Sequence, residues 1–307
     1  MAIKGIKKAP NRFFSQKEAK DFILECERDF EERFDITLNA IADISELKII
    51  ALSGPTCSGK TTAANKIISE LAERGKKVNV VSIDDFYYDK EMLHKMSADS
   101  GKEEVDYDSA ETIDISALGE FVSAISKSSD ILCPVFDFHS GRRTGYKKIS
   151  CEKDDVFIFE GIQAIYPEVT ALLREHGYYS AYIAPHSALE VDGRLILPDE
   201  LRLLRRIVRD VNFRSTDAEF TFRIWESVRN NEDKNIFPYT ESCMFRIDST
   251  FSYELGILKP YLERALGEIS SDSVYRKRAD QILETVSSVQ TIDSELLPEN
   301  SLYREFV

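Results

Sequence analysis

The sequence predicts an α/β fold of the P-loop NTPase type, in which a parallel sheet is flanked by helices. Short apolar runs recur at strand-like spacing, at residues 48–52, 78–83, 131–138, 156–159 and 178–184. Helical patterns lie between them, at residues 62–74, 115–127 and 167–175. Continuous apolar strands that alternate with helices indicate a parallel sheet covered on both faces. Because ligands of such sheets bind beyond the carboxyl ends of the strands, the polar residues that follow each strand are the candidate functional residues.

The loop after the first predicted strand matches a complete phosphate-binding pattern. Residues 54–61 read Gly-Pro-Thr-Cys-Ser-Gly-Lys-Thr, which is G-x-x-x-x-G-K-[ST] between a strand and a helix. Backbone N–H groups of such a loop cradle phosphate oxygens, and its glycines permit close approach. We expect Lys60 to reach the β- and γ-phosphates and Thr61 to ligate Mg²⁺. The expected nucleotide-binding residues are Gly54, Pro55, Thr56, Cys57, Ser58, Gly59, Lys60, Thr61 and Thr62.

The composition disfavours several classes of partner and location. The 307 residues carry a formal net charge of −14, which opposes broad electrostatic attraction to nucleic acid or to an anionic membrane. No apolar stretch approaches the roughly 20 residues of a membrane span, and no signal peptide is recognisable. The five cysteines have no metal-binding spacing. We therefore expect a cytoplasmic protein with reduced thiols.

Carboxylates follow three of the predicted strands. Asp84 and Asp85 come after the second strand, Asp137 ends the third, and Glu160 ends the fourth. A carboxylate beside a phosphate-binding loop can bind Mg²⁺ or accept the proton of an attacking hydroxyl. We expect Asp84 to be a catalytic base and Glu160 to be a magnesium or water ligand. Asp85 is expected to cap a helix, because Asp is common at that position.

An arginine-rich helical segment follows the predicted sheet. Seven arginines lie between Arg202 and Arg229, and apolar residues recur at helical spacing over residues 199–212. Such charge runs are ordinarily ion-paired surfaces. In a chain with a phosphate-binding loop, the run favours a mobile lid over residues 198–230, whose arginines close on the transferred phosphoryl group and exclude water.

Taken in order, these motifs resemble the uridine kinase and phosphoribulokinase family. They are the phosphate loop, Ser82-Ile83-Asp84-Asp85-Phe86-Tyr87, Asp106-Tyr107-Asp108, Phe136-Asp137-Phe138, Phe159-Glu160-Gly161 and Arg205-Arg206-Ile207-Val208-Arg209-Asp210. Later residues, through Tyr253-Glu254-Leu255 and the closing segment 301–306, resemble a bacterial branch of uridine kinase-like proteins. Members of that branch often carry an extra N-terminal domain, which we do not expect in this chain. The resemblance covers about residues 46–307.

The resemblance implies roles for individual residues. Asp84 matches the base that accepts the proton of a nucleoside 5′-hydroxyl, Tyr87 matches an aromatic side chain beside the acceptor, and Asp108 matches the carboxylate that holds the ribose hydroxyls. The expected catalytic residues are Asp84, Lys60, Arg206 and Arg209. The expected substrate-binding residues are Asp84, Tyr87, Asp108, Phe136, Arg206 and Arg214. The expected metal ligands are Thr61 and Glu160.

Four features depart from the pyrimidine-specific members of that family. Phe136 stands where a tyrosine helps to read the base, and Gly141 stands where a histidine does so. Ile224 replaces a glutamine that touches the ribose, and Arg214-Ser215-Thr216 replaces Arg-Gly-Arg in the lid. A site that lacks buried hydrogen-bonding partners loses discrimination by factors of ~10⁴ or more. The donor half of the site is therefore expected to be intact, whereas pyrimidine recognition is left open.

These observations predict a kinase that uses ATP or GTP with Mg²⁺ to phosphorylate a small acceptor, with the 5′-OH of a nucleoside as the leading candidate. Two alternatives stay open: another small hydroxylated acceptor, such as a sugar phosphate or a pantothenate-like acid, and a nucleotide-binding regulatory module without turnover. Neither a nucleic acid nor a membrane is expected as a partner, while a homo-oligomer stays open. The expected organisation is a helical extension over residues 1–45, a kinase core over 46–262 that includes the lid, and a C-terminal helical extension and tail over 263–307.

Overall fold

A five-stranded parallel sheet forms the centre of the computed structural model, which describes residues 3–10, 12–101, 105–107, 109–125, 127 and 130–307. The strand order is β10-β7-β2-β6-β3, and every neighbouring pair is parallel. The bounds are β2 Ile49–Ser53, β3 Val78–Ser82, β6 Val156–Glu160, β7 Tyr178–Ala184 and β10 Phe245–Asp248. The predicted fold class is confirmed.

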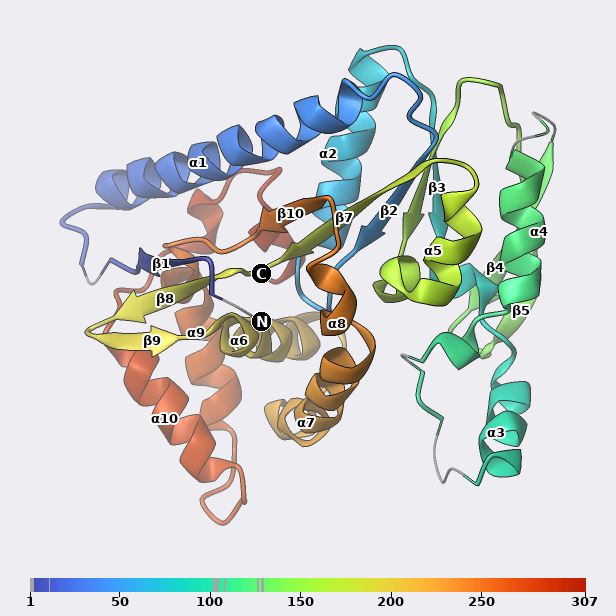
Figure 1. Cartoon of the computed structure of the whole chain (residues 1–307). Helices are drawn as coiled ribbons and strands as arrows, with labels where there is room; N and C mark the ends of the chain where they lie inside the picture. The colour runs from blue at the N-terminus through green and yellow to red at the C-terminus, as the bar shows by residue number, and fades with distance from the viewer. Residues whose placement is uncertain (1–2, 11, 102–104, 108, 126, 128–129) are drawn as a thin grey trace.

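Helices cover both faces of this sheet, and successive side chains of β2 point alternately into the two hydrophobic clusters that these helices form. Ile50 and Leu52 face one hydrophobic cluster, whereas Ile49 and Ala51 face another. Figure 1 shows α4 (Ile115–Ile125) and α5 (Pro167–Arg174) on one side of the sheet. The other side carries α1 (Gln16–Ala42), α2 (Lys60–Glu73), α6 (Pro198–Phe213) and α9 (Glu254–Gly267). All-apolar strands such as β2 are stable here because neither face meets water.

The third predicted strand does not join the central sheet, and that part of the prediction is wrong. β4 (Ile131–Asp137) pairs antiparallel with β5 (Arg142–Ile149) in a separate two-stranded sheet. Pro134 lies in the middle of β4 and cannot donate a ladder hydrogen bond, which suits a strand with one paired edge. Asp137 accepts hydrogen bonds from the backbone N–H groups of His139 and Ser140 and so closes the hairpin turn.

The sequence did not reveal a second, three-stranded sheet. β1 (Gly5–Lys8) pairs in parallel with β8 (Ser187–Val191), which pairs antiparallel with β9 (Arg194–Ile196). These strands are short, and β1 reads Gly-Ile-Lys-Lys, with too few apolar residues to stand out from a loop. The pairing fixes the N-terminal segment beside β8.

The arginine-rich helix α6 is part of the hydrophobic core. Leu201, Leu204, Ile207 and Val208 are buried along it, and the arginine Arg205 on the same helix is also buried. A helix packed in this way cannot swing as a whole without exposing its apolar face. The next helix, α7 (Ala218–Asn235), is the more exposed part of the predicted lid, with α8 (Phe237–Thr240) after it.

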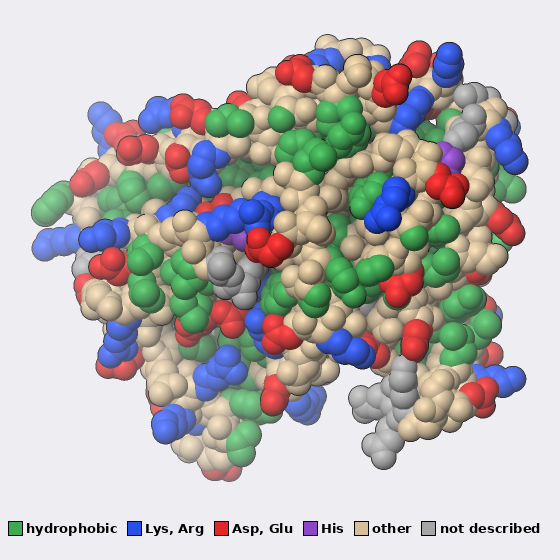
Figure 2. Space-filling view, viewed as in Figure 1, with side chains coloured by type: hydrophobic (Ala, Val, Ile, Leu, Met, Phe, Trp, Pro, Cys, Tyr) green, Lys and Arg blue, Asp and Glu red, His purple; other side chains and the backbone are tan. Residues whose placement is uncertain are grey.

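Both predicted extensions share one hydrophobic cluster with the core. Phe30 and Phe34 of α1 belong to it, as do Leu302, Tyr303 and Phe306 of the C-terminal tail. α10 (Arg276–Ser287) packs against α9 at the same side of the molecule. Basic and acidic side chains are interspersed over most of the face in Figure 2. Within the described part of the chain, none of the helices combines the length and apolarity needed to cross a bilayer.

Candidate active site

The phosphate loop lies at the carboxyl end of β2 and leads directly into α2. Its backbone is left-handed at Cys57 (φ 59°) and Gly59 (φ 92°), and Gly59 is the N-cap of α2 with no side chain bonded to the helix end. The first N–H groups of α2 are therefore available to phosphate oxygens. A Cβ at Gly54 would lie 2.4 Å from the carbonyl oxygen of Ile183, so the loop approaches β7 too closely to carry a side chain there.

The side chains of the loop differ in their exposure. Thr61 is exposed at the mouth of the loop. The half-buried residues are Thr56, Lys60 and Thr62, and the buried ones are Pro55, Cys57 and Ser58. The cation and the hydroxyl that the motif predicts to act on phosphate and metal thus reach the surface, while the buried Pro55, Cys57 and Ser58 support the loop from behind.

Strand register brings the predicted catalytic groups to one edge of the sheet. Leu52 of β2 pairs with Glu160 of β6, which pairs with Ser82 of β3. The phosphate loop and Asp84 each begin two residues beyond those positions, so they flank Glu160. Lys60 Nζ lies 3.5 Å from Glu160 Oε1. The structure therefore gathers the loop lysine and two carboxylates, as strand-end reasoning predicted.

Asp84 has the altered acidity expected of a group that exchanges a proton near neutral pH. Burial, and then the charge of Glu160, raise the pKa of Asp84 to about 6, while Lys60 and a hydrogen bond from Tyr87 oppose the rise. A base with a pKa near the working pH combines a useful ionised fraction with a real affinity for protons. The site thus contains a carboxylate that can accept a proton beside a phosphate-binding loop.

A buried amide supports this carboxylate, and the sequence interpretation missed it. Gln163 has no exposed surface, and its amide nitrogen donates to the Tyr87 hydroxyl. That hydroxyl also lies 3.3 Å from the carbonyl oxygen of Tyr107. Gln163 stands three residues after Glu160 in an otherwise apolar turn, η3 (Ile162–Ile165), and a lone amide in such a segment is the signal that could have revealed it.

Aromatic rings form one wall beside Asp84. Tyr87, Phe136 and Phe138 pack edge to face with centroid distances of 5.3–6.4 Å, and Phe138 is 67% exposed. Asp85 does not cap a helix, contrary to the prediction. It accepts hydrogen bonds from the backbone N–H of Phe136 (3.1 Å) and from Lys147 (3.2 Å), because the β4–β5 hairpin folds over it. Asp85 therefore holds this aromatic wall in place.

The predicted ribose ligand, Asp108, lies outside the described residues. Its neighbour Asp106 lies 3.9 Å from Lys234 Nζ at the end of α7. This contact brings Asp106 close to α7.

Three predicted arginines lie around one acidic residue and the phosphate loop. Arg209 donates to the Thr56 hydroxyl at 2.8 Å, which places its guanidinium against the loop. Arg206 and Arg214 both pair with Asp210, at 3.2 and 3.5 Å. Asp210 is buried and therefore collects the two cations that the family resemblance assigns to the acceptor and the phosphates. Sequence reasoning gave Asp210 no role.

The other two arginines of α6 are structural. Arg202 pairs with Glu232 and donates to the carbonyl oxygen of Thr56, and Arg205 pairs with Glu254. Both arginines are buried. Their guanidinium groups tie the phosphate loop to α7 and α9, so they stabilise the loop rather than face the reacting groups.

The predicted magnesium ligands fit an ion that is held mainly by phosphate and water. No group of three or more His, Cys, Asp or Glu able to hold a metal ion occurs in the portion of the chain that the structure describes. Thr61 offers an exposed hydroxyl and Glu160 a partly exposed carboxylate at the same edge. Mg²⁺ commonly takes one or two protein oxygens and fills its remaining positions with water and substrate phosphates.

Comparison with known proteins decides the family. The model of the phosphoribulokinase / uridine kinase family matches residues 49–251, which include every strand of the central sheet. The chain belongs to this family. It is accordingly a phosphotransferase that acts on a hydroxyl group.

Individual relatives match more than half of this family member. It is 27% identical to the uridine kinase of Ureaplasma urealyticum over 58% of this chain and 76% of that protein. It is 30% identical to the uridine kinase of Limosilactobacillus reuteri over 56% of this chain and 70% of that protein. A solved structure described as a possible uridine kinase from Bacillus stearothermophilus matches 72% of this chain and all (100%) of that chain, with 17% identity and a TM-score of 0.48.

Proposed function

We propose that this chain is an ATP- or GTP-dependent kinase that transfers the γ-phosphoryl group to the 5′-hydroxyl of a nucleoside. The observation that carries the proposal is the position of Asp84, a carboxylate with a pKa of about 6, at the sheet edge that also carries Lys60 and Glu160. A regulatory module without turnover needs the phosphate loop but not a base tuned in this way.

The donor half of the mechanism uses the phosphate loop and the cations around it. The N–H groups at the start of α2 hold the phosphates, and Lys60 neutralises charge on the β- and γ-phosphates. Arg209 lies against Thr56 and extends this positive field. Thr61 and Glu160 would hold Mg²⁺, which neutralises charge on the β- and γ-phosphate oxygens when it is bound. Glu160 pairs with Lys60 and so fixes the direction of its ammonium group.

The acceptor half uses Asp84 and the wall around it. Asp84 accepts the proton of the attacking hydroxyl as the oxygen forms its bond to the γ-phosphorus and the donor diphosphate leaves. The hydrogen bonds of Tyr87 and Gln163 fix the position of that carboxylate. The exposed ring of Phe138, with Phe136 behind it, offers an apolar surface for a flat heterocycle.

The relatives support a nucleoside as the acceptor, since the two described above are named uridine kinases. Phe136, Gly141 and Ile224 offer the base and ribose no side-chain hydrogen bond. Stacking on the aromatic wall would therefore contribute more to acceptor binding than base-edge hydrogen bonds.

A coupled assay of ADP release tests the proposal. The purified protein is supplied with Mg-ATP and, one at a time, uridine, cytidine, adenosine, a sugar phosphate or pantothenate. We expect a pyrimidine nucleoside to stimulate ADP release, and Asp84→Asn to lower kcat by a factor of about 10² to 10⁴ while the affinity for ADP stays unchanged. Stimulation only by a non-nucleoside changes the acceptor. Near-normal turnover of Asp84→Asn rejects the assigned base.

A further inference from the structure

A groove runs along α2 away from the phosphate loop, between that helix and the C-terminal tail. We call it the tail groove, and its volume is about 470 Å³. One wall carries Thr62, Asn65 and Ser69 of α2, which lie on one helical face because they are spaced by three and four residues. The other wall carries Asn300, Arg304 and Glu305 of the tail. Since Thr62 directly follows the loop hydroxyl Thr61, the groove opens where the end of a bound triphosphate nearest the sugar would lie.

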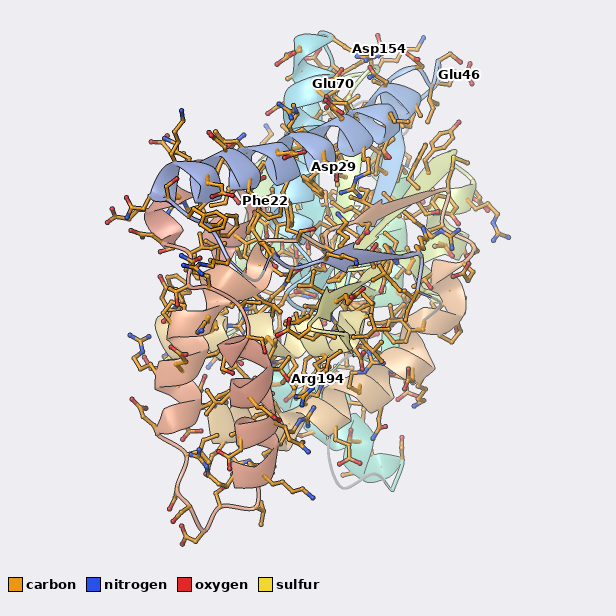
Figure 3. The ribbon with its side chains drawn as sticks, turned by 90° about the vertical axis from the view of Figure 1, so that its left-hand side faces the viewer. Phe22, Asp29, Glu46, Glu70, Asp154 and Arg194 are labelled. Carbon is orange, nitrogen blue, oxygen red and sulfur yellow. The ribbon has the colours of Figure 1, made fainter. Side chains whose placement is uncertain are left out.

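The far end of the tail groove is bounded by helices. α1 crosses beside α2 in Figure 3, and Glu70 of α2 lies close to that crossing. Leu38 of α1 lines the groove from this side. The groove therefore extends from the phosphate loop along α2 to the side where α1 lies.

The charges of the tail groove exclude a second phosphate site. Four carboxylates line it, and their residues are Glu70, Glu73, Glu299 and Glu305. The lining cations are Lys66, which is paired with Glu31, and Arg304, which donates to the carbonyl oxygens of Leu297 and Pro298. A surface with excess negative charge repels phosphate but accepts N–H donors of an uncharged heterocycle.

Two amides face the groove from opposite walls. Asn65 and Asn300 are exposed, and in the part of the chain that the structure describes neither side chain makes a hydrogen bond. An asparagine amide presents a donor and an acceptor side by side, which matches the N6 amine and N7 of adenine. These two residues can therefore read the edge of a purine base.

The tail wall is fixed relative to the phosphate loop. Leu302 is buried against Gly59, and Glu305 lies 3.5 Å from the guanidinium of Arg209, which also binds Thr56. Asn212 of α6 donates to the carbonyl oxygen of Phe306 at 3.0 Å. A wall held in this way keeps a constant distance from bound phosphates, as a base-reading surface must.

We propose that the tail groove binds the base of the donor nucleotide, and that Asn65 and Asn300 make this chain prefer adenine over guanine. This inference rests on the proposed use of a nucleoside triphosphate as the phosphoryl donor. It assigns the C-terminal tail a part in donor selection.

Calorimetric titration of the full chain with ADP, GDP and inorganic tripolyphosphate tests the proposal. Tripolyphosphate contains the phosphates without a base, so it separates loop binding from base binding. We expect Asn65→Leu and Asn300→Leu each to weaken ADP binding about tenfold and to change tripolyphosphate binding less than twofold. The matched control, Asn230→Leu, makes the same exchange at an exposed position on α7 outside the groove and should change neither.

Each other outcome overturns a defined part of the proposal. Unchanged ADP affinity in both groove variants, or equal weakening of ADP and tripolyphosphate, rejects the groove as the base site. Tighter binding of GDP than of ADP by the wild type rejects the adenine assignment. If the wild type binds neither ADP nor tripolyphosphate, the proposed donor function itself is rejected, and this inference is rejected with it.

Discussion

The guanidinium of Arg205 and the carboxylate of Glu254 form an ion pair with no exposed surface, and their Nε and Oε2 atoms lie 2.9 Å apart. Arg205 also donates to the carbonyl oxygen of Cys57 in the phosphate loop. The rings of Tyr303 and Phe306 pack on its guanidinium. One buried charge pair therefore joins α6, α9, the phosphate loop and the C-terminal tail.

Arg205→Met should lower the free energy of unfolding by about 3–5 kcal/mol, because it leaves the carboxylate of Glu254 buried without its cation. Urea denaturation measures the change. Arg214→Met is the matched control, since the Arg214 side chain is 53% exposed and its ion pair should contribute less than about 1 kcal/mol. The double variant Arg205→Met/Glu254→Met should recover part of the loss. Equal stability of Arg205→Met and Arg214→Met would contradict the structural role.

The same helix marks a limit of what its sequence could predict. The apolar spacing over residues 199–212 predicted α6, because periodicity is a local property. It could not predict that Arg202 and Arg205 are buried, because isolated arginines almost always lie at the surface. Their partners, Glu232 and Glu254, stand 30 and 49 residues later in the chain. Only the tertiary fold brings these charges together.

The pH dependence of catalysis should report Asp84. Its pKa of about 6, raised by burial and then by Glu160, means that the carboxylate is protonated in acid and cannot then accept a proton. We expect kcat/KM to be level above about pH 7 and to fall about tenfold per pH unit well below pH 6. Initial rates measured from about pH 4.5 to about pH 8.5 give this dependence of kcat/KM on pH, because that range brackets the pKa. A profile that stays level down to pH 5 would remove Asp84 from the role of base.

The same shift predicts that Asp84→Asn is more stable than the wild type at alkaline pH. The folded pKa lies above the usual value, so the stability associated with the protonated form is present at low pH and is lost as the pH rises through about 6. We compare the free energy of unfolding of Asp84→Asn with that of the wild type at two pH values. The difference, variant minus wild type, should be about 2–3 kcal/mol larger at pH 8 than at pH 4.

Asp137→Asn supplies a control of opposite sign for that experiment. Hydrogen bonds from Ser140, and then from the backbone of His139, lower the pKa of Asp137, so its charged form stabilises the hairpin turn. This variant should be less stable than the wild type at pH 8 and should approach it in acid. If the stability difference from the wild type changes with pH in the same direction for both variants, the differences do not arise from these pKa shifts.

Gln163→Leu should impair use of the acceptor and spare the donor. Its amide donates to the Tyr87 hydroxyl, which hydrogen-bonds to Asp84, so the substitution removes a support of the base without touching the phosphate loop. We expect kcat/KM for the acceptor to fall about tenfold and the KM for ATP to change less than twofold. Tyr87→Phe should have a similar effect. Equal changes in both kinetic constants would indicate general loss of folding instead.

In the candidate site, too, the residues set by local sequence pattern could be predicted, and those set by distant contacts could not. The phosphate loop, Asp84 and Glu160 could be located from sequence because each lies at the end of a strand or just beyond it, and strand ends meet at one edge. Asp85 was misassigned because its partners belong to a hairpin that apolar pattern alone placed in the central sheet. The tail wall beside Thr62 was not foreseen, since only packing brings the chain end to the loop.

Gly59→Ala and Gly75→Ala form a matched pair that tests this packing. Both glycines have a left-handed backbone, with φ of 92° and 76°. A Cβ at Gly59 would lie 2.1 Å from a methyl carbon of Leu302, whereas a Cβ at Gly75 would meet nothing within 4 Å. We expect Gly75→Ala to lower the free energy of unfolding by about 1 kcal/mol, and Gly59→Ala by about 2–4 kcal/mol.

Only Gly59→Ala should also weaken ADP binding. The added methyl group pushes residue 59, the N-cap of α2, away from the tail, and the phosphate loop moves with it. Denaturation and calorimetry on both variants measure these effects. The double variant Gly59→Ala/Leu302→Ala should be less destabilised than the sum of the single variants, because each change makes room for the other. If the losses in the free energy of unfolding are strictly additive, Leu302 does not contact Gly59, and the evidence that the tail wall is fixed to the phosphate loop is lost.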